Sequence, residues 1–173
     1  MEWGNGWWSS PVLDQIIPWV THLGSMVAVF LFIGLAWVLT RSRKVFYQLL
    51  LLYGVQAVIS YGLKFLLQRP RPISVAPFLW KLSAGPGEIL DPSFPSAHTL
   101  GAFMMATLLS HRFPRYWPPF FLVAVFIAWT RIYLGLHYPT DVIAGALLGY
   151  GVTRIFLLRT DLTIKSRPVP SEK

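Results

Sequence analysis

The chain has 173 residues, which leaves room for one domain of ordinary size. Hydrophobic residues make up 54% of it and charged residues only 13%, against about 25% charged in a typical soluble domain, so the composition excludes an ordinary soluble protein. The formal net charge is +8, but the basic residues are scattered between apolar blocks, which argues against a nucleic-acid partner. The absence of cysteine excludes a disulfide and a thiolate metal site.

The first 20 residues predict a segment that lies in the membrane interface. Trp3, Trp7 and Trp8 are of the residue type that favours the boundary between lipid and water. The stretch 11–20 is mixed in polarity, as is typical of an interfacial helix. Because the chain starts without the basic region of a signal peptide, the membrane segments themselves are expected to direct insertion.

Five apolar stretches follow, and each is predicted to be a transmembrane helix. They are 21–40, which ends at a basic cluster over 41–44, then 45–63, 96–110, 119–132 and 140–158. Gly145 and Gly149 have a spacing that predicts close packing against a neighbouring helix. The predicted fold is all-α: one membrane domain over 1–173, with about five transmembrane helices, an N-terminal interfacial helix within 1–20, an outer loop over 68–95 and a tail over 160–173.

Lysine and arginine are divided unevenly between the two sides of these spans. The turns 41–44 and 111–117 and the tail fall on one side and hold most of the basic residues. That side is predicted to be cytoplasmic by the positive-inside rule. We expect a multi-pass protein of the inner (cytoplasmic) membrane, with its C-terminus in the cytoplasm and the 68–95 loop facing the periplasm. Phe78, Leu79 and Trp80 indicate a loop segment that dips into the outer leaflet, or equally a loose linker.

Ionisable side chains gather at the outer ends of the spans, where burial near the membrane is costly and indicates function. The set is Lys64, Arg71, Ser96, His98, Arg131, His137 and Asp141. Arginine binds phosphate oxygens in pairs, lysine acts as a point charge, and histidine serves as nucleophile or general acid near neutral pH. The combination predicts a phosphate site. Arg69 is interpreted as a surface or lipid head-group contact.

Two local patterns support the phosphate site. Ser96 follows Pro95 where the third span begins, a favoured position for a helix N-cap, and a helix N-terminus attracts anions. Pro139 is placed like the first residue of the fifth helix, so Asp141 falls in that helix's first turn. From there the carboxylate is predicted to turn back and hold the imidazole of His137.

These motifs resemble a known family. Lys64, Arg71 and Pro72, then Pro95 to His98, then Arg131, His137 and Asp141 are similar to the three-part signature of the type 2 phosphatidic acid phosphatase (PAP2) superfamily. The chain departs from the usual pattern at two positions. Ala97 stands where the family usually has Gly, which keeps the position small, and Thr130 stands where it usually has Ser, which keeps the hydroxyl.

The resemblance implies a role for each residue of the signature. His137 attacks phosphorus and forms a phosphohistidine, and Asp141 orients it. His98 protonates the leaving oxygen and later activates water. The phosphoryl oxygens are bound by Lys64, Arg71, Ser96, Ala97 and Arg131. The resemblance also implies no metal and no other cofactor, and a membrane lipid with a phosphate or diphosphate head group as the partner.

Several alternatives stay open at the level of sequence. A phosphohistidine could pass its phosphate to an acceptor lipid, which would make the chain a phosphotransferase. A transporter of anions or anionic lipids is disfavoured because the polar residues gather on one side of the membrane. Two histidines with one acid make a poor zinc site. The substrate is left among lipid A 1-phosphate, undecaprenyl diphosphate and phosphatidylglycerophosphate, on which relatives in the resembled family act.

Overall fold

A computed structural model describes residues 10–75 and 91–160, and within these ranges every regular element is a helix. In chain order the elements are α1 (Pro11–Val20), η1 (Thr21–Gly24), α2 (Met26–Thr40), α3 (Arg43–Leu67), α4 (Pro72–Val75), α6 (Ala97–Arg112), η3 (Pro114–Tyr116), α7 (Trp117–Tyr133) and α8 (Pro139–Arg159). The all-α prediction is confirmed. The Trp residues of the first segment, the Phe78–Trp80 stretch and the tail lie outside the described residues.

Three of these helices begin at a serine whose side chain accepts a hydrogen bond from a backbone N–H of the first turn. Ser25 accepts from Ala28 at 3.3 Å and Ser42 from Val45 at 3.4 Å, and the third is the predicted cap, Ser96. Such caps satisfy donors that the first turn leaves without a helical partner.

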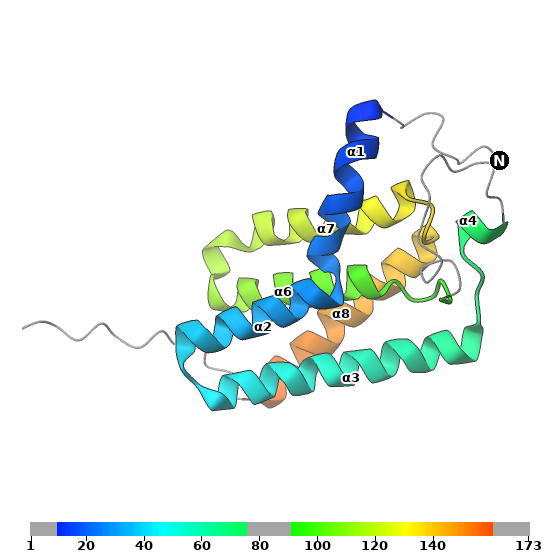
Figure 1. Cartoon of the computed structure of the whole chain (residues 1–173). Helices are drawn as coiled ribbons and strands as arrows, with labels where there is room; N and C mark the ends of the chain where they lie inside the picture. The colour runs from blue at the N-terminus through cyan, green and yellow to red at the C-terminus, as the bar shows by residue number, and fades with distance from the viewer. Residues whose placement is uncertain (1–9, 76–90, 161–173) are drawn as a thin grey trace, which may run out of the picture.

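The predicted span over 21–40 is wrong at its start. Residues Thr21–Gly24 form a tight 3₁₀ turn, α2 begins only at Met26, and the chain bends by 51° between Pro11–Gly24 and Met26–Thr40. The physical cause is close packing: a Cβ on Gly24 would lie 2.6 Å from the backbone oxygen of His98. The turn η1 therefore packs against the start of α6. The preceding helix, α1, rises steeply from the bundle (Figure 1).

The helices pack into a bundle, with α4 at one end of it (Figure 1). One buried cluster joins α2, α3 and α6: Val29, Ile33, Val45, Leu49, Leu52, Met104 and Leu108. A second joins α6 to α7 through Ala102, Ala106, Ala124 and Ile127. The α4 end of the bundle holds a third apolar cluster and, beside it, a group of buried polar residues; the cluster is Ile17, Ile73, Tyr133, Leu134 and Leu136.

The predicted close packing at Gly145 and Gly149 is confirmed, and α6 is the partner helix. A Cβ on Gly145 would lie 2.6 Å from the backbone oxygen of Ser96, and one on Gly149 would meet the backbone oxygen of Leu100. Both glycines let α8 approach the α6 backbone directly. The contact sets the distance between the start of α6 and the start of α8.

We expect Gly145→Ala to destabilise the folded protein by about 1–3 kcal/mol, because the added methyl group overpacks a backbone contact. Thermal unfolding in detergent measures the effect. Gly151→Ala on the same helix is the matched control, because a Cβ there meets nothing within 4 Å. That change should leave the melting temperature unchanged or raise it, since alanine favours helix. Equal losses for both variants would contradict the packing account.

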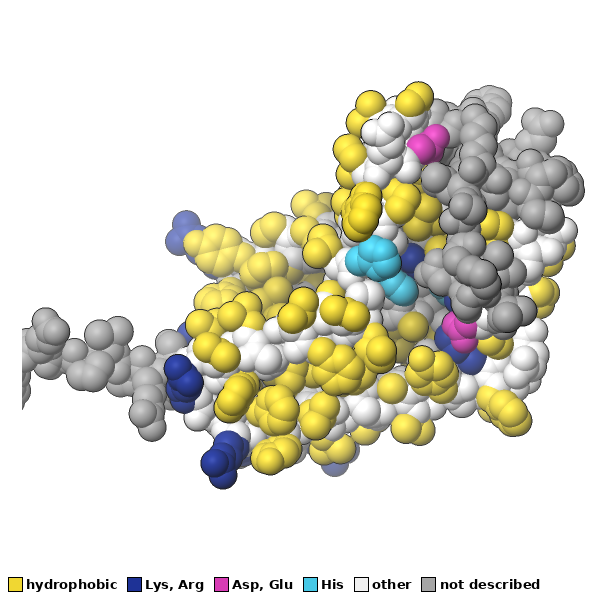
Figure 2. All heavy atoms as spheres, in the orientation of Figure 1, with side chains coloured by type: hydrophobic (Ala, Val, Ile, Leu, Met, Phe, Trp, Pro, Cys, Tyr) yellow, Lys and Arg dark blue, Asp and Glu magenta, His cyan; other side chains and the backbone are white. Residues whose placement is uncertain are grey.

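Apolar side chains cover the sides of the bundle, and lysines and arginines project at the end away from α4 (Figure 2). Val58, Phe65 and Leu158 are each more than 70% exposed, which is unfavourable in water and suits contact with lipid. Within the described ranges, the stretches Arg43–Val75 and Pro139–Arg159 are long and apolar enough to cross a membrane, and the bent pair ending in α2 is a third candidate. With 16 and 17 residues, α6 and α7 are shorter.

Candidate active site

Six of the eight predicted site residues line one cavity of about 280 Å³ at the α4 end of the bundle: Lys64, Arg71, Ala97, His98, Arg131 and His137. They come from the last turn of α3, the connection after it, the first turn of α6, the end of α7 and the loop before α8. Ser96 and Asp141 lie behind the cavity wall, each 0% exposed. These residues are far apart along the chain, and the fold brings them together in one site.

The first turns of α6 and α8 hold this wall in place. Ser96 Oγ accepts hydrogen bonds from Thr99 N at 3.4 Å and from Thr99 Oγ1 at 3.0 Å. Ser96 N donates in turn to the backbone oxygen of Asp141 at 3.1 Å, which ties the two helix starts together. Ser96 therefore caps α6 as predicted, and its hydroxyl faces the helix rather than the cavity. Ala97 and His98 present the start of α6 to the cavity.

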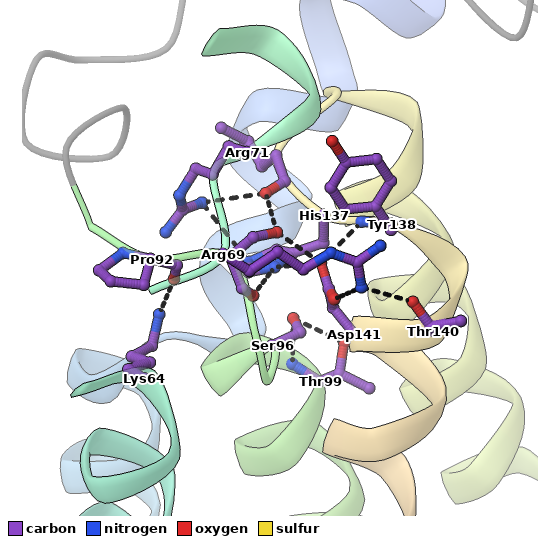
Figure 3. Close-up of polar contacts among 12 residues, drawn as sticks. Lys64, Arg69, Arg71, Pro92, Ser96, Thr99, His137, Tyr138, Thr140 and Asp141 are labelled. Atoms are coloured by element: carbon purple, nitrogen blue, oxygen red, sulfur yellow. Dashed lines mark hydrogen bonds and ion pairs between the residues drawn. The ribbon is translucent and has the colours of Figure 1, made fainter. Parts of the chain in front are cut away.

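The imidazole of His137 is 2% exposed and has a defined orientation (Figure 3). Its Nδ1 lies 2.6 Å from the backbone oxygen of Ser93, and its Nε2 lies 3.5 Å from Nη1 of Arg71. A carbonyl oxygen only accepts, so Nδ1 carries the proton and the lone pair of Nε2 accepts a long hydrogen bond from Arg71. A lone pair beside a guanidinium group is placed to attack a phosphoryl group bound there.

Asp141 lies beside this imidazole, one helical turn further along the chain. Its Oδ2 is 3.8 Å from Nδ1 of His137, an ion-pair distance rather than a hydrogen bond. The same oxygen accepts from Tyr138 N at 2.9 Å, a capping box at the start of α8, and from Ser93 Oγ. Because Asp141 lies in the first turn of α8, its carboxylate caps that helix. It acts on His137 through its negative charge and by binding Ser93, whose backbone oxygen contacts the imidazole.

Burial lowers the pKa of His137 from its usual 6.5 to about 4. The carboxylate of Asp141 opposes this shift, whereas the charges of Arg131, Arg71 and Lys64 add to it. Because its pKa is lowered, the imidazole of His137 is neutral, and therefore nucleophilic, near neutral pH.

Three residues that sequence reasoning missed complete the site, and Arg69 is the first of them. The sequence predicted a surface or head-group contact for Arg69. In the structure its Nη1 lies 2.7 Å from Asp141 Oδ1 and 2.7 Å from Thr140 Oγ1. Its guanidinium group also lies 4.0 Å from the centre of the Tyr138 ring (Figure 3). Arg69 thus fixes the start of α8 from the outside. Its separation from Asp141 by 72 positions left no local signal.

The other two, Asp91 and Ser93, come from the end of the predicted outer loop. Asp91 Oδ2 accepts from Lys64 Nζ at 2.6 Å and from Arg71 Nη2 at 3.0 Å, and Arg71 Nε donates to the backbone oxygen of Asp91 at 2.7 Å. A carboxylate oxygen therefore sits between two cations that are each about 4% exposed.

Arg131 reaches the cavity from the end of α7 and is 1% exposed. Its Nη1 donates to Thr21 Oγ1 at 2.9 Å, and Thr130 Oγ1 lies 3.0 Å from Thr21 Oγ1. The turn η1 therefore positions this arginine, which explains why the bend before α2 matters to the site. The hydroxyl that Thr130 keeps at its position also donates to the backbone oxygen of Ile127 at 2.6 Å.

Comparison with known proteins places this arrangement in a family. The sequence profile of the PAP2 superfamily matches residues 45–163, more than half of the chain. An undecaprenyl-diphosphatase of Sulfolobus acidocaldarius is 32% identical over 110 residues, 63% of this chain and 52% of that protein. A lipid A 1-phosphatase of Rhizobium johnstonii is 43% identical over 81 residues, 44% of this chain and 32% of that protein. The matches thus span about half, or less, of these relatives' own length.

Similarity to a solved structure extends over more of the chain. The crystal structure of Aquifex aeolicus LpxE superimposes with a TM-score of 0.70 and 30% sequence identity, over 90% of each chain. The profile match includes every residue of the three motifs from Lys64 to Asp141. On these grounds the chain belongs to the PAP2 superfamily.

Proposed function

We propose that this chain is an integral membrane phosphatase that hydrolyses lipid phosphates or diphosphates through a phosphohistidine on His137, without a metal. The observation that carries the proposal is the unprotonated Nε2 of a buried imidazole, which faces Arg71 in a cavity shared with Lys64 and Arg131. Three cations draw in a phosphate dianion and stabilise the charge of its transition state. Nε2 of His137 lies in the same cavity and is the nucleophile that attacks the bound phosphoryl group.

The proposed reaction has two transfers. In the first, Nε2 of His137 forms a bond to phosphorus as the bond to the leaving oxygen breaks, and His98 gives that oxygen a proton. In the second, His98 takes a proton from water, the water oxygen bonds to phosphorus, and the bond to Nε2 breaks. Binding of the substrate replaces Asp91 as the acceptor between Lys64 and Arg71. Asp141 and Ser93 keep the Nδ1 proton in place throughout.

For the membrane arrangement we propose five spans, α2, α3, α6, α7 and α8, with α1 at the interface. The three shortest spans, α2, α6 and α7, have 15, 16 and 17 residues. They would extend about 23–26 Å at 1.5 Å per residue, somewhat less than a hydrocarbon core of about 30 Å. Basic residues gather at the end opposite the site: Arg41, Arg43, Lys44, Arg112, Arg115, Arg154 and Arg159. This supports a site that faces the periplasm and a cytoplasmic C-terminus.

Fusion of a reporter that is active only in the periplasm tests this orientation. Placed after Lys173, the reporter is expected to be silent, because the preceding helix ends at the basic side. The same reporter inserted within 76–90 serves as the positive control and is expected to be active. Strong periplasmic activity from the C-terminal fusion would place the site on the cytoplasmic face and contradict the proposal.

Substrate choice is tested by phosphate release from purified protein in detergent micelles. The candidates are lipid A 1-phosphate, undecaprenyl diphosphate and phosphatidylglycerophosphate, two of which correspond to the names of the relatives above. Each is assayed with and without an added acceptor lipid. Release of inorganic phosphate without an acceptor supports the hydrolase. Transfer of phosphate to the acceptor, with no release in its absence, would support the phosphotransferase instead.

Metal independence gives a further expected result. Activity should be unchanged in excess EDTA, because the proposed charge stabilisation comes from lysine and arginine side chains alone. In the described ranges no three His, Asp or Glu side chains are grouped to hold a metal ion. Vanadate should inhibit, because it forms a five-coordinate adduct resembling the transition state. Loss of activity in EDTA that Mg²⁺ or Zn²⁺ restores would contradict the histidine-only mechanism.

A further inference from the structure

Arg69 contacts two residues that hold the nucleophile, although it is not among the residues that line the site cavity. Its side chain donates from Nη1 to Asp141 Oδ1 at 2.7 Å, and its backbone oxygen accepts from Ser93 N at 2.7 Å. Ser93 Oγ in turn donates to Asp141 Oδ2. The three residues therefore form a closed hydrogen-bond network in which each residue contacts the other two.

This network reaches His137 through the carbonyl group of Ser93. The Ser93 backbone oxygen lies 2.6 Å from Nδ1 of His137, and this contact sets which imidazole nitrogen carries the proton. Ser93 itself is 0% exposed. Arg69 binds its backbone N–H and Asp141 binds its hydroxyl. The carbonyl oxygen that orients the imidazole is thus held in place through both the backbone and the side chain of Ser93.

The network also contains a buried negative charge. The side chain of Asp141 is 0% exposed, and a buried carboxylate is unfavourable unless a cation and hydrogen-bond donors stabilise it. The guanidinium group of Arg69 supplies a positive charge from the outside, where its side chain is 37% exposed. Nη1 also donates to Thr140 Oγ1, and the group lies over the Tyr138 ring at 4.0 Å (Figure 3). Arg69 therefore neutralises Asp141 without occupying the phosphate cavity.

We infer that Arg69 is a positioning residue for the nucleophile, His137. Arg69 keeps the Ser93 oxygen in place, that oxygen holds the Nδ1 proton, and Nε2 therefore stays directed at the phosphorus. The inference rests on the proposed phosphatase function and extends its mechanism to a residue outside the cavity. Because other cations line the cavity and bind the phosphate, a change at Arg69 alters the nucleophile and leaves phosphate binding in place.

Arg69→Gln removes the charge and keeps a polar side chain. We expect kcat to fall by about 10- to 100-fold, the loss typical of a small displacement of a reacting group. KM should stay close to the wild-type value, because phosphate binding is retained. Phosphate release by the full chain in detergent micelles measures both constants, on the candidate lipid that the wild type hydrolyses fastest and well below the melting temperature of either protein. A merely structural arginine would lower the melting temperature and leave kcat of the folded protein unchanged.

A change of leaving group separates a displaced nucleophile from a displaced general acid. Arg69→Gln should lower kcat/KM by the same factor on p-nitrophenyl phosphate as on the lipid, because Nε2 of His137 attacks phosphorus in both. A loss confined to the lipid would mean that the variant disturbs proton transfer by His98 instead. That result would overturn the inference.

Two control variants each match one part of the change. Thr140→Val removes the second contact of Nη1 and keeps the ion pair with Asp141, so it should retain most of the wild-type kcat. Arg112→Gln removes an arginine that also lies over an aromatic ring, that of Phe113 at 4.8 Å, and it should keep the wild-type kcat. An equal loss in Thr140→Val would mean that Arg69 acts only by anchoring the start of α8, and would overturn its action through Asp141.

Arg69→Lys keeps the inference testable if the glutamine variant does not fold. Lysine retains a positive charge near Asp141 but lacks the planar fork of arginine. Its kcat should therefore lie below that of the wild type and above that of Arg69→Gln, with KM unchanged. A wild-type kcat in either folded variant, or a raised KM alone, would overturn the positioning role and leave the phosphatase intact. No phosphate release by the wild type from any candidate lipid would instead overturn the proposed function, and the positioning role with it.

Discussion

Replacing His137 by alanine is expected to reduce phosphate release by about 10³–10⁵-fold, the loss typical of removing a nucleophile. The backbone oxygen of Ser93 fixes the imidazole through Nδ1, so Nε2 is the atom aimed at the cations. Steady-state release of inorganic phosphate from a lipid substrate in micelles measures the loss.

The matched control is His111→Ala, which removes an exposed histidine that lies outside the site cavity. It should retain wild-type activity. Substrate binding should survive in His137→Ala, because Lys64, Arg71 and Arg131 remain. Retention of more than about one tenth of the wild-type rate by His137→Ala would exclude this residue as the nucleophile.

His98→Ala is expected to give the second largest loss, and its size should depend on the leaving group. An alkyl phosphate releases an alkoxide that needs a proton, and a positioned general acid contributes about 10²–10⁴-fold. The p-nitrophenolate ion leaves without one. We therefore expect the loss on an alkyl phosphate to exceed that on p-nitrophenyl phosphate by about 10²-fold or more in the first transfer.

Single-turnover measurement of the alcohol or nitrophenol released isolates that first transfer from the later hydrolysis. In the structure His98 lines the same cavity as His137, from the start of α6. Equal fractional losses on the two substrates would mean that His98 binds phosphate and transfers no proton.

The helices and the motif residues were predictable from the sequence because their signals are local. Apolar runs end at serine caps, prolines and basic clusters, and the glycine spacing on α8 correctly indicated a close contact. Ser96 and Pro139 stand at helix starts, and the cap and turn preferences that place them there depend only on the neighbouring three or four residues. The one boundary that failed, at the start of α2, depends on contact between Gly24 and the distant His98 backbone.

The second layer of the site could not be predicted in this way. Arg69 pairs with Asp141 across 72 positions, and Ser93 contacts His137 across 44. Neither pairing leaves a periodicity or spacing in the sequence. The carboxylate of Asp141 lies 3.8 Å from Nδ1 of His137 rather than at hydrogen-bond distance, because the helix cap and Ser93 occupy the same carboxylate oxygen. Competition between partners for one atom is visible only in three dimensions.

The stereochemical course at phosphorus tests the central claim most directly. Hydrolysis of a chiral, isotopically labelled thiophosphate ester in labelled water reports whether one or two in-line transfers occur. A phosphohistidine on His137 requires two transfers, each with inversion, so the account predicts net retention of configuration. Net inversion would mean that water attacks phosphorus directly, with His137 serving as a general base, and would contradict the covalent mechanism.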